Sequence, residues 1–173
     1  MSRRIATVIV IAAVLALGGG SLRHTLSEAL DGSTGGGSAT RAGPTAIVAR
    51  VVDGDTIVLR GGERIRYIGM DTPETVKPGT PVQCFAKAAG HENARLVAGR
   101  RVRLRYDAER RDRYGRTLAY VYRASDGLFV NAELVRRGYA RQLTIPPNVA
   151  HAPLFGRLAA QARERGRGLW RAC

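Results

Sequence analysis

The chain has 173 residues, a length that suits one folded domain rather than several. It carries 28 lysines and arginines against 14 aspartates and glutamates, a formal net charge of +14. This excess attracts polyanions in a salt-dependent way, so it favours nucleic acid as a partner, followed by acidic polymers of the cell envelope. A coding bias toward arginine explains the scarcity of lysine, but it does not explain the shortage of acids.

The first segment of the chain has the pattern of an export signal. Arg3 and Arg4 precede an apolar run of 13 residues, from Ile5 to Leu17. That run is shorter than the roughly 20 residues that a membrane-spanning helix needs. We expect residues 1–18 to be a signal peptide, with an uncleaved N-terminal membrane anchor as the alternative. In both cases the protein is expected to be secreted or extracytoplasmic.

A polar tract separates this segment from the rest of the chain. Residues 19–44 are rich in glycine, serine and threonine, which bury too little apolar surface to fold, so we expect a flexible linker. The folded domain is then expected over residues 45–173. Four basic and two acidic residues precede residue 45, which leaves 24 against 12. The positive excess therefore belongs to the domain itself.

The first part of the domain predicts three consecutive strands. Short apolar runs cover residues 46–52, 56–60 and 64–70. The pairs Asp53-Gly54 and Gly61-Gly62 separate these runs, and such pairs favour two-residue hairpin turns with positive φ at both central positions. The sequence therefore predicts an antiparallel meander with a tight turn at each pair.

The same stretch concentrates acidic side chains around one arginine, Arg66. Asp53 and Asp55 lie at the first turn, and Asp71 and Glu74 follow the third strand, so the meander brings the four carboxylates together. Converging carboxylates repel one another unless a cation lies among them, and oxygen ligands favour a hard cation such as Ca²⁺. The alternative is that individual aspartates here only form turns.

The rest of the domain alternates predicted helices and strands. Helical spacing of apolar residues covers residues 83–98, 130–138 and 153–165, and strand patterns cover residues 100–106 and 117–122. In the strand at 100–106, arginines alternate with apolar residues. Its outer face is therefore either a solvated row of cations or a surface that steers a phosphate backbone.

A predicted turn at residues 112–115 places Arg116 at the edge of the sheet. The planar guanidinium group binds phosphate oxygens through two parallel hydrogen bonds and keeps its charge at physiological pH. Arg116 is therefore a candidate phosphate ligand.

The chain has two cysteines, Cys84 and Cys173, which are too few for a thiolate metal site. In an exported protein such a pair favours a disulfide, which would join the start of the first helix to the C-terminal tail. Closing so long a loop stabilises a fold by about 4 to 5 kcal/mol on the chain-entropy account.

Three motifs in this order resemble the staphylococcal nuclease (thermonuclease) family. They are DGDT at residues 53–56, IRYIGMDTPE at 65–74 and DRYGRTLAYVY at 112–122, and the resemblance covers residues 46–170. It implies an α+β domain with an OB-fold, a five-stranded barrel with three helices. It also implies a Ca²⁺-dependent endonuclease that hydrolyses DNA and RNA, preferably single-stranded or unpaired, to products with 3′-phosphate ends. A monomer is expected.

The resemblance assigns roles to individual positions in the acidic stretch. Asp55 and Asp71 match the family's metal-binding carboxylates, and Thr72 matches the residue whose backbone carbonyl contacts the metal. Asp53 matches an acid close to these ligands.

The resemblance also implies a catalytic trio and a set of substrate contacts. The trio corresponds to Arg66, Glu74 and Arg116, in which the arginines stabilise negative charge on the phosphate and Glu74 acts on the attacking water. The residues expected to bind substrate are Lys77, Arg113 and Tyr114. Family members often carry two nucleotide-contacting tyrosines after the second helix, whereas residues 141–147 read RQLTIPP.

Two further functions are compatible with parts of the pattern. One is a non-catalytic OB-fold module that binds nucleic acid at the cell exterior through its arginines. The other is an envelope protein that uses its charge to bind acidic polymers. The presence of Arg66, Glu74 and Arg116 together favours the nuclease over both.

Overall fold

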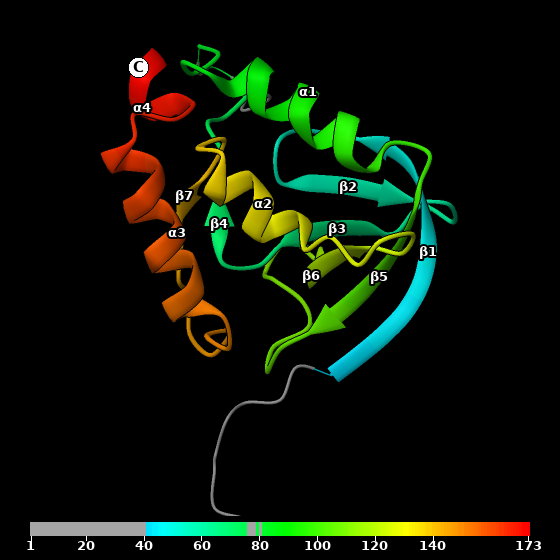
Figure 1. Ribbon diagram of the computed structural model, residues 1–173. Coiled ribbons are helices and arrows are strands. Elements are labelled where there is room, and N and C mark those ends of the chain that lie inside the picture. Colours follow the sequence, from blue (N-terminus) through cyan, green and yellow to red (C-terminus); the bar gives the residue numbers. More distant parts are fainter. Residues whose placement is uncertain (1–40, 76–78, 80) are drawn as a thin grey trace, which may run out of the picture. The chain divides into compact units, whose positions relative to one another are not determined.

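The computed structural model describes residues 41–75, 79 and 81–173 (Figure 1). The expected signal segment, most of the expected linker and Lys77 lie outside this range. Among the described residues, no helix is long and apolar enough to cross a membrane.

Five strands form a closed barrel in the order β1-β2-β3-β6-β5. Their bounds are β1 Arg41–Val51, β2 Thr56–Leu59, β3 Arg64–Tyr67, β5 Arg101–Tyr106 and β6 Thr117–Arg123. Only the β3–β6 pairing is parallel. The early part of β1 pairs with β5 and its later part with β2, so this one bent strand closes the barrel. The expected OB-type barrel is confirmed, and its first strand starts before the expected domain boundary at Thr45.

The barrel interior follows from the alternation of apolar and polar residues along the strands. In β5, Val102, Leu104 and Tyr106 are buried, whereas the arginines between them are exposed. Ile57 and Ile65 contribute from the neighbouring strands β2 and β3 and are fully buried. Because side chains two residues apart share one face of a strand, this pattern separates the core from the cationic outer surface.

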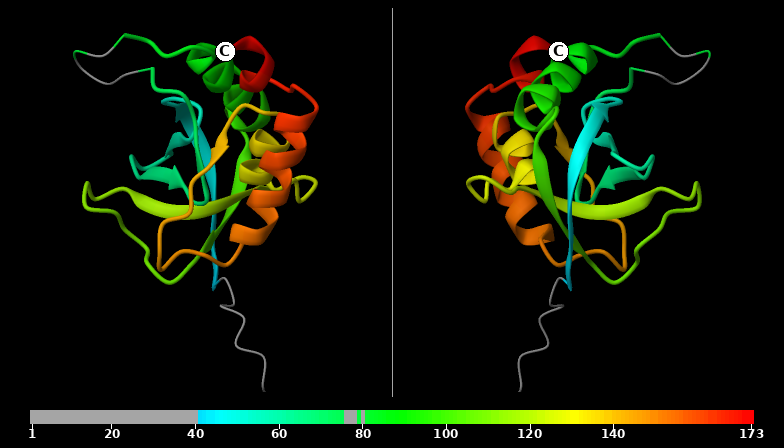
Figure 2. Two further views of the ribbon diagram at one scale, coloured as in Figure 1. Left: turned by 90° about the vertical axis from the view of Figure 1, so that its left-hand side faces the viewer. Right: turned by 90° about the vertical axis from the view of Figure 1, so that its right-hand side faces the viewer.

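The three expected helices are present within a few residues of their predicted bounds. They are α1 Ala86–Val97, α2 Val130–Arg136 and α3 Ala152–Glu164. Figures 1 and 2 show α1 across one end of the barrel and α2 between the barrel and α3. A further short helix, α4 (Leu169–Ala172), buries Leu169 and was not expected from the sequence.

The expected third strand, residues 64–70, is divided in two. The chain leaves the barrel at Ile68 and Gly69, and a short strand β4 (Met70–Asp71) then pairs with β7 (Arg141–Gln142). This second sheet connects the chain just before the Asp71 motif to the segment that follows α2. The division places Asp71 on the second sheet, from which its carboxylate contacts Arg66 of barrel strand β3.

One of the two predicted turns is right and the other is wrong. Gly61 and Gly62 both have positive φ, 105° and 91°, and connect β2 to β3 as expected. Neither Asp53 nor Gly54 has positive φ. The Asp53 carboxylate instead accepts a hydrogen bond from the backbone N–H of Asp55 at 3.1 Å, so the side chain replaces the turn geometry that was predicted.

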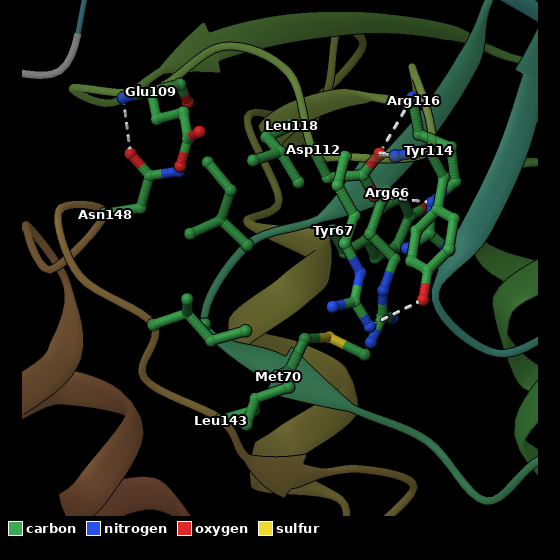
Figure 3. A pocket seen from close by; sticks show the side chains of 14 residues that line it. Arg66, Tyr67, Met70, Glu109, Asp112, Tyr114, Arg116, Leu118, Leu143 and Asn148 are labelled. Atoms are coloured by element: carbon green, nitrogen blue, oxygen red, sulfur yellow. Dashed lines mark hydrogen bonds and ion pairs between the residues drawn. The ribbon is translucent and has the colours of Figure 1, made fainter.

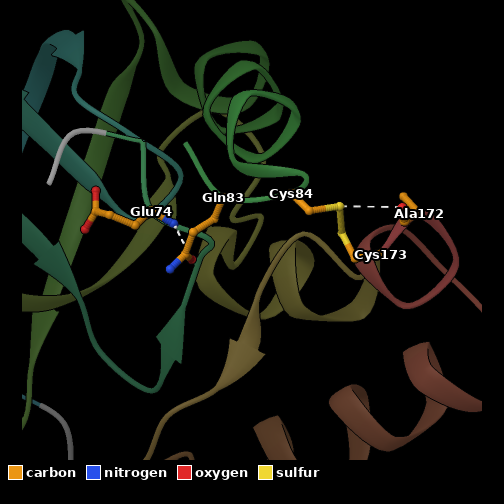
Figure 4. Close-up of a disulfide and its surroundings, with 5 residues drawn as sticks. All are labelled: Glu74, Gln83, Cys84, Ala172 and Cys173. Atoms are coloured by element: carbon orange, nitrogen blue, oxygen red, sulfur yellow. Dashed lines mark hydrogen bonds between the residues drawn. A yellow bond between two sulfur atoms is a disulfide. The ribbon is translucent and has the colours of Figure 1, made fainter. Parts of the chain in front are cut away.

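The predicted disulfide between Cys84 and Cys173 is confirmed, and its two Cα atoms are 6.0 Å apart (Figure 4). It joins the residue just before α1 to the end of α4, across 89 positions of sequence. The backbone N–H of Leu169 also donates to the carbonyl of Gly138 at 2.9 Å. The C-terminal turn is therefore attached both covalently and by its backbone.

Removal of the disulfide should destabilise the domain without changing its fold. We expect the double variant Cys84→Ser, Cys173→Ser to lose up to about 4 to 5 kcal/mol in free energy of unfolding, because its unfolded chain regains the entropy of an open loop. Urea titrations followed by circular dichroism would measure the loss. An unchanged midpoint would show that the loop was already constrained in the unfolded chain.

Candidate functional site

Asp55 connects the two acidic motifs of the chain. Its carboxylate is 6% exposed, and its Oδ2 accepts hydrogen bonds from the backbone N–H of Thr72 at 2.9 Å and the Thr72 hydroxyl at 2.8 Å. Its Oδ1 accepts a hydrogen bond from the hydroxyl of Thr56 at 3.1 Å. These contacts hold the segment after β4 against the loop between β1 and β2.

Gly54 allows this close approach of the two motifs. A Cβ atom at position 54 would lie 2.6 to 2.8 Å from side-chain atoms of Thr72, closer than van der Waals contact permits. A glycine is therefore required here by packing, although its φ is an ordinary one.

Arg66 lies between the carboxylates of Asp55 and Asp71. Its Nη2 donates to Asp71 Oδ1 at 2.6 Å, and its Nη1 forms an ion pair with Asp55. Arg66 is therefore paired through both terminal nitrogens with carboxylates of the two acidic motifs. Burial alone would lower the pKa of Arg66, but the charges of Asp55 and Asp71 outweigh it and raise the pKa.

The neighbouring carboxylates are costly to ionise. Burial raises the pKa of Asp53 to about 6, and the negative charge of Asp55 adds to this effect. Burial also raises the pKa of Asp71, against the opposing positive charge of Arg66. A cation bound among these groups would reduce the cost of their ionisation.

Arg116 projects from the loop before β6 and is held by Asp112. Asp112 Oδ2 accepts a hydrogen bond from Arg116 Nε at 2.7 Å, and Oδ1 accepts from the backbone N–H groups of Arg116 and Tyr114. Although burial would raise the pKa of Asp112, these hydrogen bonds lower it below its usual range. The carboxylate is thus a fixed anchor for the arginine and its turn, a role that we did not predict. An Asp four residues before an Arg across a glycine turn was the available signal.

Arg66, Arg116 and most of the other predicted site residues meet in one cleft of about 550 Å³. The predicted residues that line it are Asp53, Asp55, Arg66, Asp71, Thr72, Glu74, Tyr114 and Arg116. Two residues that sequence reasoning missed, Arg64 and Pro73, line it as well. Arg113 does not line this cleft, and Lys77 lies outside the described residues. Both arginines of the expected trio thus face the same space as the acidic cluster.

A second cleft of about 510 Å³ lies beside the first and shares Arg66, Tyr114 and Arg116 with it (Figure 3). Arg113 lines this second cleft, donates to the Tyr114 hydroxyl at 2.7 Å and lies over its ring. Leu143 and Ile145, from the segment that lacks tyrosines, also line it. The two clefts together form a surface that changes from charged to apolar.

The acidic cluster fits a hard cation with few protein ligands. In the part of the chain that the structure describes, no three Asp, Glu, His or Cys side chains surround a common point. A cation would therefore be held by Asp55 and Asp71, with the backbone carbonyl of Thr72 and water oxygens completing its shell. Ca²⁺ accepts such a mixed set of oxygens in flexible geometry.

Comparisons with known proteins place the chain in a family. Residues 64–172 match a family model described as staphylococcal nuclease homologue. A thermonuclease of Staphylococcus intermedius is 45% identical over 131 residues, covering 74% of this chain and 77% of that protein. A thermonuclease of Staphylococcus hyicus is 41% identical over 126 residues, with 71% and 73% covered. Endonuclease YncB of Bacillus subtilis (strain 168) is 38% identical over 126 residues, with 70% and 59% covered.

The matched residues include β3 with Arg66, the acidic segment after it, the loop that carries Arg116 and the C-terminal helices. The first two relatives cover more than two thirds of this chain and have more than two thirds of their own length covered. This extent excludes a match limited to one short motif. The chain belongs to the staphylococcal nuclease family.

Proposed function

We propose that this protein is a Ca²⁺-dependent endonuclease that hydrolyses phosphodiester bonds of DNA and RNA and leaves 3′-phosphate ends. Its membership of the family makes it a phosphodiester-hydrolysing nuclease. The observation that carries the finer proposal is one cleft in which Asp55 and Asp71 lie beside Arg66, with Glu74 and Arg116 on the same walls.

Two guanidinium groups are available to bind the phosphate undergoing attack. The transition state carries more negative charge on its non-bridging oxygens than the ground state does, so fixed cations that contact those oxygens lower the barrier. Arg66 lines the cleft between Asp55 and Asp71, where a phosphate oxygen could approach its guanidinium group. Asp112 holds Arg116 through Nε, which orients the guanidinium toward the shared cleft.

Glu74 is the proposed general base. A water molecule attacks the phosphorus atom while Glu74 accepts its proton, and the bond from phosphorus to the 5′ oxygen breaks. The 5′ oxygen takes a proton from solvent water and leaves as a hydroxyl group, and the 3′ oxygen keeps the phosphate. A bound Ca²⁺, held by Asp55, Asp71 and the Thr72 carbonyl, would supply further stabilisation of phosphate charge. Arg116 acts as an electrostatic stabiliser, because a guanidinium group is a poor proton donor.

The substrate surface favours unpaired strands. Tyr114 is 68% exposed at the junction of the two clefts, where a base released from pairing can stack on its ring. Leu143 and Ile145 add apolar contact area in place of the tyrosines found in other members. The disulfide supports an oxidising location, so we propose a secreted or extracytoplasmic monomer.

Chelation should abolish activity reversibly. We expect EGTA to stop digestion of single-stranded DNA and added CaCl₂ to restore it, because Asp55 and Asp71 bind the required ion. End-group analysis of the products should find 3′-phosphate. Circular dichroism in EGTA serves as the control, since the protein must remain folded. Full activity under chelation would contradict the calcium requirement.

The three charged residues should each be necessary for turnover. We expect Glu74→Gln, Arg66→Lys and Arg116→Lys to lower kcat by roughly 10²- to 10³-fold, since each removes a base or a two-pronged phosphate contact. Arg157→Lys, an exposed position on α3, is the matched control and should keep wild-type activity. A Glu74→Gln variant with unchanged kcat would exclude the proposed base. If these variants bound DNA normally but the wild type cleaved nothing, the non-catalytic binding module would replace the nuclease.

The raised pKa of Asp53 predicts a pH-dependent difference in stability. The pKa of the Asp53 carboxyl group is about 6 in the folded protein, against a usual value of 3.8. The unfolded chain therefore loses this proton at lower pH than the folded protein does, so that folding becomes less favourable as the pH rises from about 4 to 6. In EDTA, Asp53→Asn should therefore gain stability relative to the wild type over that range, by at most roughly 1.4 kcal/mol per pH unit. Asparagine keeps the Oδ1 acceptor for Asp55.

Urea unfolding at several pH values would measure this difference. Asp126→Asn is a suitable control, because the pKa of Asp126 is lowered to about 2 by Arg123 and its folded form no longer titrates above pH 4. Its stability relative to the wild type should be nearly constant above pH 5. If the difference in free energy of unfolding between Asp53→Asn and the wild type were also independent of pH, the pKa of Asp53 would not be raised in the folded protein.

A further inference from the structure

Glu74 is held by its backbone from the far end of the loop that follows it. The backbone N–H of Glu74 donates to Gln83 Oε1 at 2.8 Å, and the backbone N–H of Gln83 donates to the Glu74 carbonyl at 3.0 Å. Figure 4 shows the side chain of Gln83 turned toward the Glu74 backbone, with the Glu74 carboxylate pointing away from it. Gln83 thus fixes both peptide groups of Glu74 and leaves its side chain toward the cleft.

Gln83 is in turn attached to the C-terminal tail. The next residue, Cys84, is bonded to Cys173, and its sulfur lies 3.5 Å from the carbonyl of Ala172. The tail itself is anchored, since Leu169 is buried and donates to Gly138 through its N–H. A continuous connection therefore runs from buried Leu169 to Glu74.

The other side of Glu74 has a separate anchor. Thr72 is held by its two hydrogen bonds to Asp55. Pro73, which lies between Thr72 and Glu74, is buried. Asp55 thus fixes the chain that enters position 74, and Gln83 fixes the peptide groups of position 74 itself. Loss of the Gln83 side chain would remove the acceptor of the Glu74 N–H.

We propose that Gln83, kept in place by the Cys84–Cys173 disulfide, is a positioning residue for Glu74. The inference rests on the proposed role of Glu74 as the general base. This role gives the disulfide a second purpose, because the Cys84–Cys173 bond then supports turnover as well as stability. Catalytic groups must be held close to their productive geometry, and a misplacement of about 1 Å can cost on the order of 100-fold in rate.

A double-mutant cycle separates this role from a purely structural one. We expect Gln83→Ala to lower kcat on a single-stranded DNA oligonucleotide by roughly 10-fold with KM nearly unchanged, because substrate contacts by Arg66 and Arg116 remain. In a Glu74→Gln background the same substitution should have no further effect, because the group that it positions is already gone. Gln83→Glu keeps an acceptor at Oε1 and should recover part of the loss.

A matched control and a structural readout accompany the cycle. Gln142→Ala removes side-chain hydrogen bonds to Thr144 and Ala152 from another exposed glutamine, outside both clefts, and should keep wild-type kcat. Amide hydrogen exchange should become faster at Glu74 in Gln83→Ala, whether or not the protein is active. All assays are run where circular dichroism shows each variant folded.

The disulfide is tested in the same assay. The variant Cys84→Ser, Cys173→Ser, measured below its own unfolding transition, should lose kcat in the same direction as Gln83→Ala, again with KM nearly unchanged. Wild-type protein treated with dithiothreitol should match it and recover on reoxidation. A disulfide-free protein with full kcat would show that the disulfide is not needed to keep Gln83 in place.

The outcomes distinguish failure of this inference from failure of the proposed function. If Glu74→Gln retains full kcat, the general-base role is wrong and the positioning role falls with it. If Glu74→Gln is impaired but Gln83→Ala lowers kcat equally in both backgrounds, Glu74 is the base and Gln83 acts elsewhere. If Gln83→Ala changes neither kcat nor the exchange rate at Glu74, the hydrogen bond from the Glu74 N–H to Gln83 Oε1 does not position the base.

Discussion

The hydrogen bonds from Thr72 to Asp55 are the contacts on which the site depends. They join two segments that are 17 positions apart in sequence, and they do so inside the protein, where competition with water is weak. Through them Asp55 fixes the chain immediately after Asp71 and immediately before Glu74. This link fixes the distance between the two proposed metal ligands, Asp55 in the loop between β1 and β2 and Asp71 on β4, so that one cation could be held by both.

The site concentrates charge of both signs within a strongly cationic domain. The positive charge of the domain draws nucleic acid toward the protein, and the cleft contains Asp55 and Asp71, the proposed ligands of a cation beside the phosphate. Arg66 connects the two requirements, because it balances the charges of Asp55 and Asp71 and also lines the cleft in which the phosphate would lie. An isolated metal site or an isolated arginine pair would lack this combination.

Local patterns in the sequence predicted the strands and helices, because these follow from short-range rules, whereas the resemblance to the nuclease family implied the barrel and the candidate site residues. Alternation of apolar residues gave the five strands, and the motif residues converge once the meander forms. The turn at Asp53-Gly54 was mispredicted, since the rule for such pairs assumes positive φ, whereas here Asp53 bonds to Asp55 and glycine is needed to make room for Thr72. The division of residues 64–70 was also missed, because it depends on pairing of β4 with the distant strand β7.

What sequence reasoning missed at the site was the support around the proposed catalytic residues. Asp112 orients Arg116, Gln83 holds the backbone of Glu74, and neither contact follows from the chemistry of phosphate hydrolysis. The role of such supporting residues becomes apparent only in the folded structure, where they contact residues on the other side of a turn or a loop. The barrel supplies Arg66 from β3, but Glu74 and Arg116 lie on loops, so each of these two loops requires a specific hydrogen bond to hold its functional side chain. The same need explains why a disulfide at the end of the chain is connected, through a single glutamine, to an acid in the cleft.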